Sequence, residues 1–336
     1  MENNFNTHIE HRKRPINIID SDEHLFQHEY EYICNEPVLK NYLNAFFNTE
    51  GYVYQNFKPV IETLSTNKST QSNYLKNLIK CIFLNHKRIN KSAFFIHDYW
   101  YEGYFHWNMD ALPKLYFISQ DTNLKNAKLI IPNYYLKIKY IKESLVLLGF
   151  NENNFISVDY SKVCYCKSIS YCPPFTISGN YHTEITLKMA AVLKNRADTS
   201  TNKPIRLIYV TRRNAQKRKI INESEIEKIL VKFGFEIIET DNLSYVEQIH
   251  LFNAAKWLIS IHGAALTNML FMNKATNVLE IRNENDASNN CYFSLASAMG
   301  LNYYYLKGKR MSEDADHVGN LYIEPAILEK LLYSYL

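Results

Sequence analysis

The sequence predicts an α/β protein whose second half contains a parallel, doubly wound sheet. Between residues 205 and 281, short apolar runs alternate with segments whose apolar residues recur at helical spacing. Parallel strands need long crossovers, and helices of this length supply them. The chain has 336 residues, 46% of them hydrophobic, which is enough for two domains of ordinary size.

The charge balance argues against a nucleic-acid-binding protein. The chain carries 38 Lys and Arg residues against 34 Asp and Glu residues, and its net charge is only +4. A basic run at residues 11–14 could contact an anionic membrane surface or could simply be solvated. The six cysteines give no disulfide framework in a chain this long, so we expect reduced thiols.

The first residues are polar where a secretory signal would be apolar, and no run of eighteen apolar residues occurs. We therefore expect a cytoplasmic protein whose contact with the inner face of a membrane is at most peripheral. The sequence makes no prediction about its oligomeric state.

The chain is predicted to form two domains. Residues 1–195 make the first, and a polar segment at 196–203 with little apolar content is the predicted linker. Residues 204–320 make the second domain. A last helix at 321–336 is expected to pack back on the N-terminal domain.

Strands and helices already alternate within the predicted first domain. Apolar runs predict strands at residues 16–19, 94–96 and 129–132. Helical spacing predicts helices at 138–148 and 183–196. This alternation favours a sheet covered by helices.

A histidine and an aspartate follow the predicted strand at 94–96. If residues 104–111 are helical, His106 and Asp110 are four residues apart and share one face. Pro113 cannot donate a hydrogen bond to Met109, so the helix should kink or restart there. An imidazole beside a carboxylate can act as an acid-base pair, although a helix-surface pair that only hydrogen-bonds has the same spacing.

Two acidic pairs resemble motifs that hold a divalent metal. Asp20 and Asp22 follow the predicted first strand, and Asp314 and Asp316 repeat the spacing. Such a short pattern is common by chance. No metal site is therefore predicted.

The predicted second domain has the clearest rhythm. Asn222 with Glu225 and Ser244 with Glu247 each have the spacing of a helix capping box. Gly234 is the predicted stop of the first of these helices. Strands are predicted at residues 205–210, 235–238, 257–261 and 277–281. Helices are predicted to begin at the two capping pairs and after the turn that follows residue 261.

The strand at 257–261 passes through a turn of small residues into a helix. Free backbone N–H groups and the positive end of a helix dipole at such a turn suit a phosphate. Gly263, Ala264 and Ala265 leave those amides open, while His262 and Asn268 can add donors. Close strand-helix packing also demands small residues and is the alternative reading.

Further polar residues fall at the same predicted sheet edge, where doubly wound sheets bind ligands. Arg212, Arg213 and Arg218 can chelate phosphate, and Glu280 can accept hydrogen bonds from ribose hydroxyls. With the turn after residue 261, they predict a nucleoside-diphosphate site.

Four ordered stretches, at residues 209–213, 218–223, 243–249 and 262–268, resemble glycosyltransferase family 61, in its bacterial-type members. His106 with Asp110 resembles the histidine-to-aspartate spacing of that family. The resemblance implies a GT-B architecture, two Rossmann-like domains facing across a cleft. It also implies transfer with inversion and no required metal or other cofactor.

The implied substrates are a nucleotide sugar, expected to be a UDP-sugar, and a glycan or lipid-linked glycan acceptor of surface polysaccharide synthesis. In the expected mechanism Asp110 takes the acceptor proton with help from His106. Two other functions stay open. A polysaccharide pyruvyltransferase would need a phosphoenolpyruvate donor. A non-catalytic glycan-binding or scaffold subunit would explain the 26 tyrosines, whose rings stack on sugars.

Overall fold

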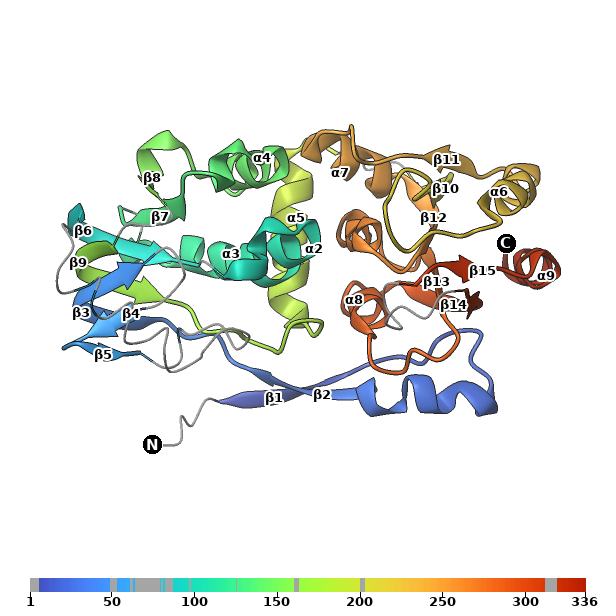
Figure 1. Ribbon diagram of the computed structural model, residues 1–336, viewed down its shortest axis with the longest axis horizontal. Helices are drawn as coiled ribbons and strands as arrows, with labels where there is room; N and C mark the ends of the chain where they lie inside the picture. The colour runs from blue at the N-terminus through green and yellow to red at the C-terminus, as the bar shows by residue number, and fades with distance from the viewer. Residues whose placement is uncertain are drawn as a thin grey trace. The chain divides into compact units, whose positions relative to one another are not determined.

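The computed structural model describes residues 6–48, 53–60, 87–96, 98–124, 126–159, 163–199, 203–311 and 319–336, together with the single residues 63, 79 and 81. The chain divides into two compact units (Figure 1). Unit 1 contains Asn35–Phe175, and unit 2 contains both Thr7–Cys34 and Thr176–Leu336. Each unit combines a sheet with helices, as expected for an α/β protein.

Unit 2 therefore takes residues from both ends of the chain, unlike the contiguous domains expected from the sequence. In its N-terminal part, β1 (Thr7–His11) pairs with β2 (Glu31–Asn35). The backbone N–H of Ile16 donates to the carbonyl of Tyr303 at 2.8 Å. Such long-range hydrogen bonds leave no local sequence pattern. The predicted linker at 196–203 falls within unit 2, and residues 200–202 lie outside the described part.

The strand predicted at residues 16–19 is wrong. These residues form a turn, after which the 3-10 helix η1 (Asp20–Leu25) begins. Asn17 exchanges hydrogen bonds with the backbone of Tyr305, so the segment is held by polar contacts rather than by sheet pairing.

The sheet of unit 2 confirms the predicted parallel arrangement. Its order is β11-β10-β12-β13-β14-β15, and only β15 among these strands is antiparallel to its neighbour. The strands are β10 (Arg206–Val210), β11 (Glu236–Ile238), β12 (Ala255–Ile261), β13 (Asn277–Asn283), β14 (Asn302–Arg310) and β15 (Leu321–Tyr322). The chain order reverses between β10 and β12, which makes their carboxyl ends the topological switch point where doubly wound sheets bind ligands.

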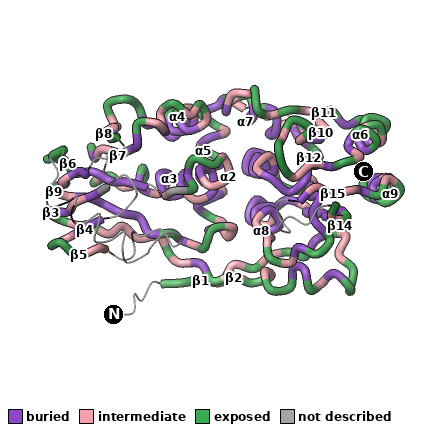
Figure 2. The backbone as a smooth tube through the Cα atoms, in the orientation of Figure 1, coloured by how far each residue is buried: buried purple, intermediate pink, exposed green. Residues whose placement is uncertain are grey.

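Helices cover both faces of this sheet (Figure 1). On one face α6 (Glu223–Lys232) contacts α9 (Pro325–Tyr335). The other face carries α5 (Thr183–Arg196), α7 (Tyr245–Asn253), α8 (Cys291–Ala298) and the 3-10 helix η9 (Ala264–Phe271), which contact one another. Strands β12 and β13 between them are buried along almost their whole length (Figure 2).

The last helix, α9, completes the core of unit 2. Leu328, Leu331 and Leu332 are buried in one cluster with Trp257 and Ile281. The sequence analysis instead expected residues 321–336 to pack back on the N-terminal domain. An apolar stripe shows that a helix packs against something, but it does not identify the partner.

The two predicted capping boxes differ in outcome. Ser244 and Glu247 form theirs at the start of α7, each side chain bonding to the backbone of the other residue. Asn222 makes no side-chain cap, and its amide bonds instead to the backbone of Ile323. The capping box predicted for Asn222 and Glu225 is therefore wrong, because the asparagine joins α6 to the segment before α9.

Unit 1 has a mixed sheet in the order β5-β4-β3-β9-β6-β7-β8. Strands β9, β6, β7 and β8 are parallel, and the others are antiparallel. The strands are β3 (Lys40–Asn48), β4 (Val53–Gln55), β5 (Lys58–Pro59), β6 (Lys87–Phe95), β7 (Lys128–Pro132), β8 (Phe155–Val158) and β9 (Val163–Tyr171). The strand predicted at 129–132 is confirmed, as is the helix predicted at 138–148, which is α4 (Lys139–Leu147).

The two arginines of the basic run at residues 11–14 form ion pairs. The guanidinium of Arg12 is buried and contacts Glu29 at 2.7 Å, and Arg14 contacts Glu23 at 2.9 Å. Carboxylates of the same unit therefore compensate both arginines. Within the described residues, no helix has the length and apolar content needed to cross a bilayer.

Truncation of Leu328 tests the place of α9 in the unit 2 core. Leu328→Ala should lower the free energy of unfolding by about 2–5 kcal/mol, because a fully buried leucine leaves a cavity. Ile327 is 54% exposed, so Ile327→Ala should change it by less than about 0.5 kcal/mol. Urea denaturation followed by circular dichroism makes the comparison. Equal effects of the two variants would contradict the assignment.

Candidate functional site

The loops after β10 and β12 meet at the switch point of the unit 2 sheet. Gly263, the second residue after β12, lies directly against Arg212, the second residue after β10. A Cβ atom built on Gly263 would lie 2.9 Å from Nη1 of Arg212. The predicted arginine loop and the predicted small-residue turn are therefore in contact.

Arg212 sits in surroundings that favour an anion. Burial and the positive charge of nearby Arg218 lower the pKa of its guanidinium. Its Nε is buried and has no hydrogen-bond partner among the described residues. Within that same part of the chain, no carboxylate lies within 4.0 Å of the Arg212 or Arg218 guanidinium. Two neighbouring guanidinium groups without a direct ion pair among the described residues favour a negative ligand.

The loop is held in a conformation that needs support. Arg218 has a φ of +57°, in the left-handed region, which costs a non-glycine residue roughly 1–2 kcal/mol. Residues other than glycine keep a left-handed conformation only where the surrounding structure holds the backbone in place. Such conformations cluster at binding sites.

Glu223 supplies part of this support, and the sequence analysis missed its role. This carboxylate, 9% exposed at the start of α6, accepts hydrogen bonds from the hydroxyls of Tyr209 and Thr211 and from the backbone N–H of Arg212. It thereby joins the end of β10 to the helix that follows the loop. The signal available in the sequence was the acidic residue in the first turn of that helix.

His262 and Glu280 form a buried pair beside the turn. Nδ1 of His262 donates a hydrogen bond to Glu280, whose other oxygen accepts one from the hydroxyl of Tyr303. The Glu280 side chain is fully buried, whereas we expected it at the sheet edge contacting ribose. The physical reason is that β13 continues to Asn283, so Glu280 lies within the strand opposite Ser260. It orients His262.

The charge of this pair is stabilised inside the protein. Burial alone would raise the pKa of Glu280, but the charge and hydrogen bond of His262, the charge of Arg282 and the Tyr303 hydroxyl outweigh it and keep that pKa below its usual value. The carboxylate therefore stays ionised and holds the imidazole by Nδ1. The other ring nitrogen, Nε2, is on the opposite side of the ring from this contact.

Two residues predicted to bind the donor are engaged elsewhere. Arg213 points its guanidinium to Glu227 at 2.6 Å and Glu239 at 3.7 Å, so its charge is compensated. Asn268 is 1% exposed, and its amide donates to Gln248 and to the carbonyl of Ala265. Asn268 thus stabilises the turn from inside.

The turn itself begins η9. Ala264 and Ala265 are its first two residues, and Gly263 precedes them with extended backbone angles. The first N–H groups of a helix have no partner within that helix. A narrow pocket beside the turn is lined by Arg218, His262 and Asp286. The geometry of unit 2 thus gathers Arg212, Arg218, His262 and the residues of the turn at one point.

In unit 1, His106 and Asp110 pair as their spacing predicted. Nδ1 of His106 lies 2.7 Å from Oδ2 of Asp110, and the two side chains are 30% and 17% exposed. The helix changes to a π-helical turn, η5 (Trp107–Ala111), directly before α3 (Leu112–Gln120), in which Pro113 stands in the first turn. This restart of the helix was predicted. Such π turns recur at functional sites.

The surroundings of the pair contain residues that the sequence analysis missed. Lys114 is buried one turn after Asp110 and donates to the Tyr101 hydroxyl at 2.8 Å. Burial lowers the pKa of Lys114, and the negative charge of Asp110 opposes this shift. The ring of Trp100, a residue that is 46% exposed, lies 5.7 Å from that of His106. A partly exposed tryptophan therefore lies beside the pair.

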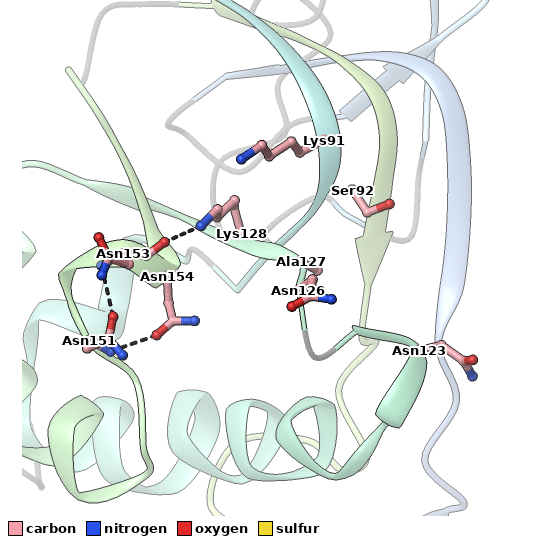
Figure 3. A pocket seen from close by; sticks show the side chains of 9 residues that line it. All are labelled: Lys91, Ser92, Asn123, Asn126, Ala127, Lys128, Asn151, Asn153 and Asn154. Carbon is pink, nitrogen blue, oxygen red and sulfur yellow. Dashed lines mark hydrogen bonds between the residues drawn. The ribbon is translucent and has the colours of Figure 1, made fainter.

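A larger hollow of about 610 Å³ lies elsewhere in unit 1 (Figure 3). It is lined by Lys91 and Lys128 and by asparagines that precede β8. Asn151, Asn153 and Lys128 already bond to one another and to nearby backbone. The hollow adjoins the starts of β7 and β8, whereas ligands of parallel sheets bind at the carboxyl ends, so we assign it no role.

The carboxylate of Asp22 is engaged by side chains of β14. This buried carboxylate contacts Lys307 at 2.8 Å and accepts a hydrogen bond from Tyr305. It anchors η1 on β14. Asp314 and Asp316 lie outside the described residues.

Comparison with known proteins adds an independent finding. A model of the family described as Glycosyltransferase 61 matches residues 104–279. The chain is also similar to enzymes named EGF domain-specific O-linked N-acetylglucosamine transferase. It is 31% identical to the Drosophila melanogaster protein over 30% of this chain and 19% of that one, and 30% identical to the Xenopus laevis protein over 36% and 24%. The match thus spans about a fifth to a quarter of these relatives.

The pair of His262 and Glu280 predicts a pH dependence. Because the folded-state pKa of Glu280 lies below the usual 4.5, its stabilising effect is complete above that value and is lost as the pH falls through the lowered pKa. Glu280→Gln should therefore lower the free energy of unfolding by on the order of 3 kcal/mol at neutral pH. The deficit relative to wild type should shrink on acidification.

Urea denaturation across the acidic range measures this difference. Glu284 is exposed and follows the same strand, so Glu284→Gln is the matched control and should follow wild type at every pH. A deficit for Glu280→Gln that stays constant down to the lowest pH would contradict the assignment.

Proposed function

Because the chain belongs to the glycosyltransferase 61 family, we propose that it transfers a sugar from a nucleoside-diphosphate sugar to a hydroxyl group of an acceptor. The observation that supports this most is the contact of Arg212 with Gly263 at the switch point of unit 2. It brings positive charge that forms no direct ion pair among the described residues to the N-terminus of a helix, as a diphosphate requires.

In the proposed donor complex, the diphosphate lies between Arg212, Arg218 and the backbone amides of Ala264 and Ala265. His262, held by Glu280, offers Nε2 to a phosphate oxygen or to the sugar. As the bond to the anomeric carbon breaks, negative charge develops on the leaving oxygen. Fixed guanidinium groups and amides stabilise that charge without reorganising, so we propose that transfer needs no metal.

The acceptor side of the proposal rests on unit 1. Asp110 takes the proton of the acceptor hydroxyl as its oxygen attacks, and His106 orients the carboxylate and stabilises its charge. One base and one displacement give inversion at the anomeric carbon. The proposal requires that an acceptor held at this pair meet the donor bound by unit 2, as in a GT-B enzyme.

We propose a UDP-sugar as donor, with UDP-N-acetylglucosamine the first to test, because that sugar stands in the names of the similar animal enzymes. We propose a glycan as acceptor, as in polysaccharide synthesis. The exposed indole of Trp100 beside His106 supports this, since aromatic faces pack on sugar rings.

Donor identity is tested by mass-detected hydrolysis and transfer over a panel of UDP-sugars, with phosphoenolpyruvate in the same panel. Release of UDP from one of the sugars supports the proposal. Turnover of phosphoenolpyruvate alone would show a pyruvyltransferase. Failure to bind any nucleotide would favour a glycan-binding subunit.

Arg212 and Arg213 offer a matched pair for the diphosphate site. Arg212→Ala should weaken UDP binding by about 10–100-fold, because hydrogen bonds to charged groups contribute about 1.5–3 kcal/mol. Arg213→Ala should leave it nearly unchanged, since that guanidinium contacts Glu227 and Glu239. Isothermal titration calorimetry with UDP makes the comparison. Equal losses in the two variants, or none in either, would refute this diphosphate site.

Substitution of the acid-base pair tests the chemistry separately from binding. Asp110→Asn should lower kcat by about 10²–10⁴-fold while the Kd of the donor stays unchanged, because the base acts on the acceptor. His106→Gln should lower kcat less. Asp121→Asn, at the end of α3, is the control that keeps its activity. Nearly full turnover in both Asp110→Asn and His106→Gln would remove the pair from the mechanism.

A further inference from the structure

A cluster of metal-ligating side chains lies in unit 2, apart from the residues of the proposed donor site. His8, Glu10, Cys34 and His182 each direct one ligand atom into it, and these atoms all lie within 4.8 Å of one another. Cys34 is fully buried and His182 is 6% exposed. The side chains of His8 and Glu10 are 35% and 18% exposed, so the cluster is enclosed on one side and reachable from the other.

Strand geometry explains why these residues meet. His8 and Glu10 are two apart on β1 and therefore share one face of the strand. The backbone N–H of Arg12 bonds to the carbonyl of Tyr30. His8 lies four residues before Arg12 and Cys34 lies four residues after Tyr30, so the two face each other across the paired strands. His182 precedes α5, whose first residue, Thr183, bonds to Glu10. Figure 1 shows that end of α5 beside β1 and β2.

The chemistry of the four donors selects zinc. Two imidazoles, one thiolate and one carboxylate balance the charge of a divalent ion and make a tetrahedral set. A thiolate disfavours magnesium and calcium, which take oxygen ligands. With metal-ligand distances of about 2.0–2.3 Å, tetrahedral ligand atoms are roughly 3.3–3.8 Å apart. Nε2 of His8 and Oε1 of Glu10 are 3.1 Å apart, and all four ligand atoms lie within 4.8 Å of one another, so small side-chain movements would bring them to these distances.

A second layer of contacts fixes one ligand. The carboxylate of Glu10 accepts hydrogen bonds from the backbone N–H and the hydroxyl of Thr183, at 3.0 and 2.8 Å. Partners of this kind orient metal ligands and raise their affinity. We propose that His8, Glu10, Cys34 and His182 bind a structural zinc ion that joins β1, β2 and the start of α5.

Metal content of the purified protein tests the proposal. After loading with zinc and desalting, the wild type should retain about one zinc per chain by elemental mass spectrometry. The cobalt-loaded protein should show a thiolate charge-transfer band and the visible spectrum of a tetrahedral site. Chelation should lower the Tm of the wild type.

His8→Gln should lose the zinc and the cobalt spectrum, and its Tm should no longer respond to the chelator. His11→Gln is the matched control, because His11 lies on the opposite face of the same strand, 69% exposed, and should behave as wild type. Circular dichroism verifies that both variants fold. A wild type that retains no zinc, a cobalt spectrum without the thiolate band, or full zinc retention by His8→Gln would each overturn the proposal.

Discussion

The guanidinium of Arg212 lies against the backbone of Gly263, and the arrangement of the proposed donor site at the switch point of unit 2 depends on this contact. With a Cβ atom at 2.9 Å from Nη1, any larger residue at 263 would displace the arginine. Glu223 fixes the arginine's backbone from one side, and the buried pair of Glu280 and His262 fixes the turn from the other. Glu223 and Glu280 thus position Arg212 and the turn, although neither carboxylate forms an ion pair with the Arg212 guanidinium.

The same physical device occurs in both units. A carboxylate accepts a hydrogen bond from Nδ1 of a histidine in the pairs Glu280–His262 and Asp110–His106. The first pair is buried, so its carboxylate serves to orient the ring. The second is partly exposed, and its Asp110 lies in a π-helical turn, so it can meet a substrate. Burial, rather than residue type, separates the pair that orients a ring from the pair that we propose to be catalytic.

Much of this arrangement could be predicted because it is local. The parallel sheet of unit 2 follows from strand-helix alternation, and the proximity of Arg212 to the turn follows from the rule that parallel strands end at one edge. The exact end of β13 was not predictable from its apolar run, and two more strand residues placed Glu280 inside the sheet. Likewise, Arg213 pairs with Glu227 in α6 and with Glu239 directly after β11. Sequence spacing alone does not predict that these two carboxylates lie near Arg213.

Unit 2 is assembled from segments that unit 1 separates in the chain, and this order matters during translation. Residues 7–34 leave the ribosome before any strand of the six-stranded sheet of unit 2 exists, whereas unit 1 is fully synthesised once Phe175 has emerged. The nascent chain can therefore fold its middle first. Ile16 must wait for Tyr303, so the early segment stays without this backbone partner until β14 has been made.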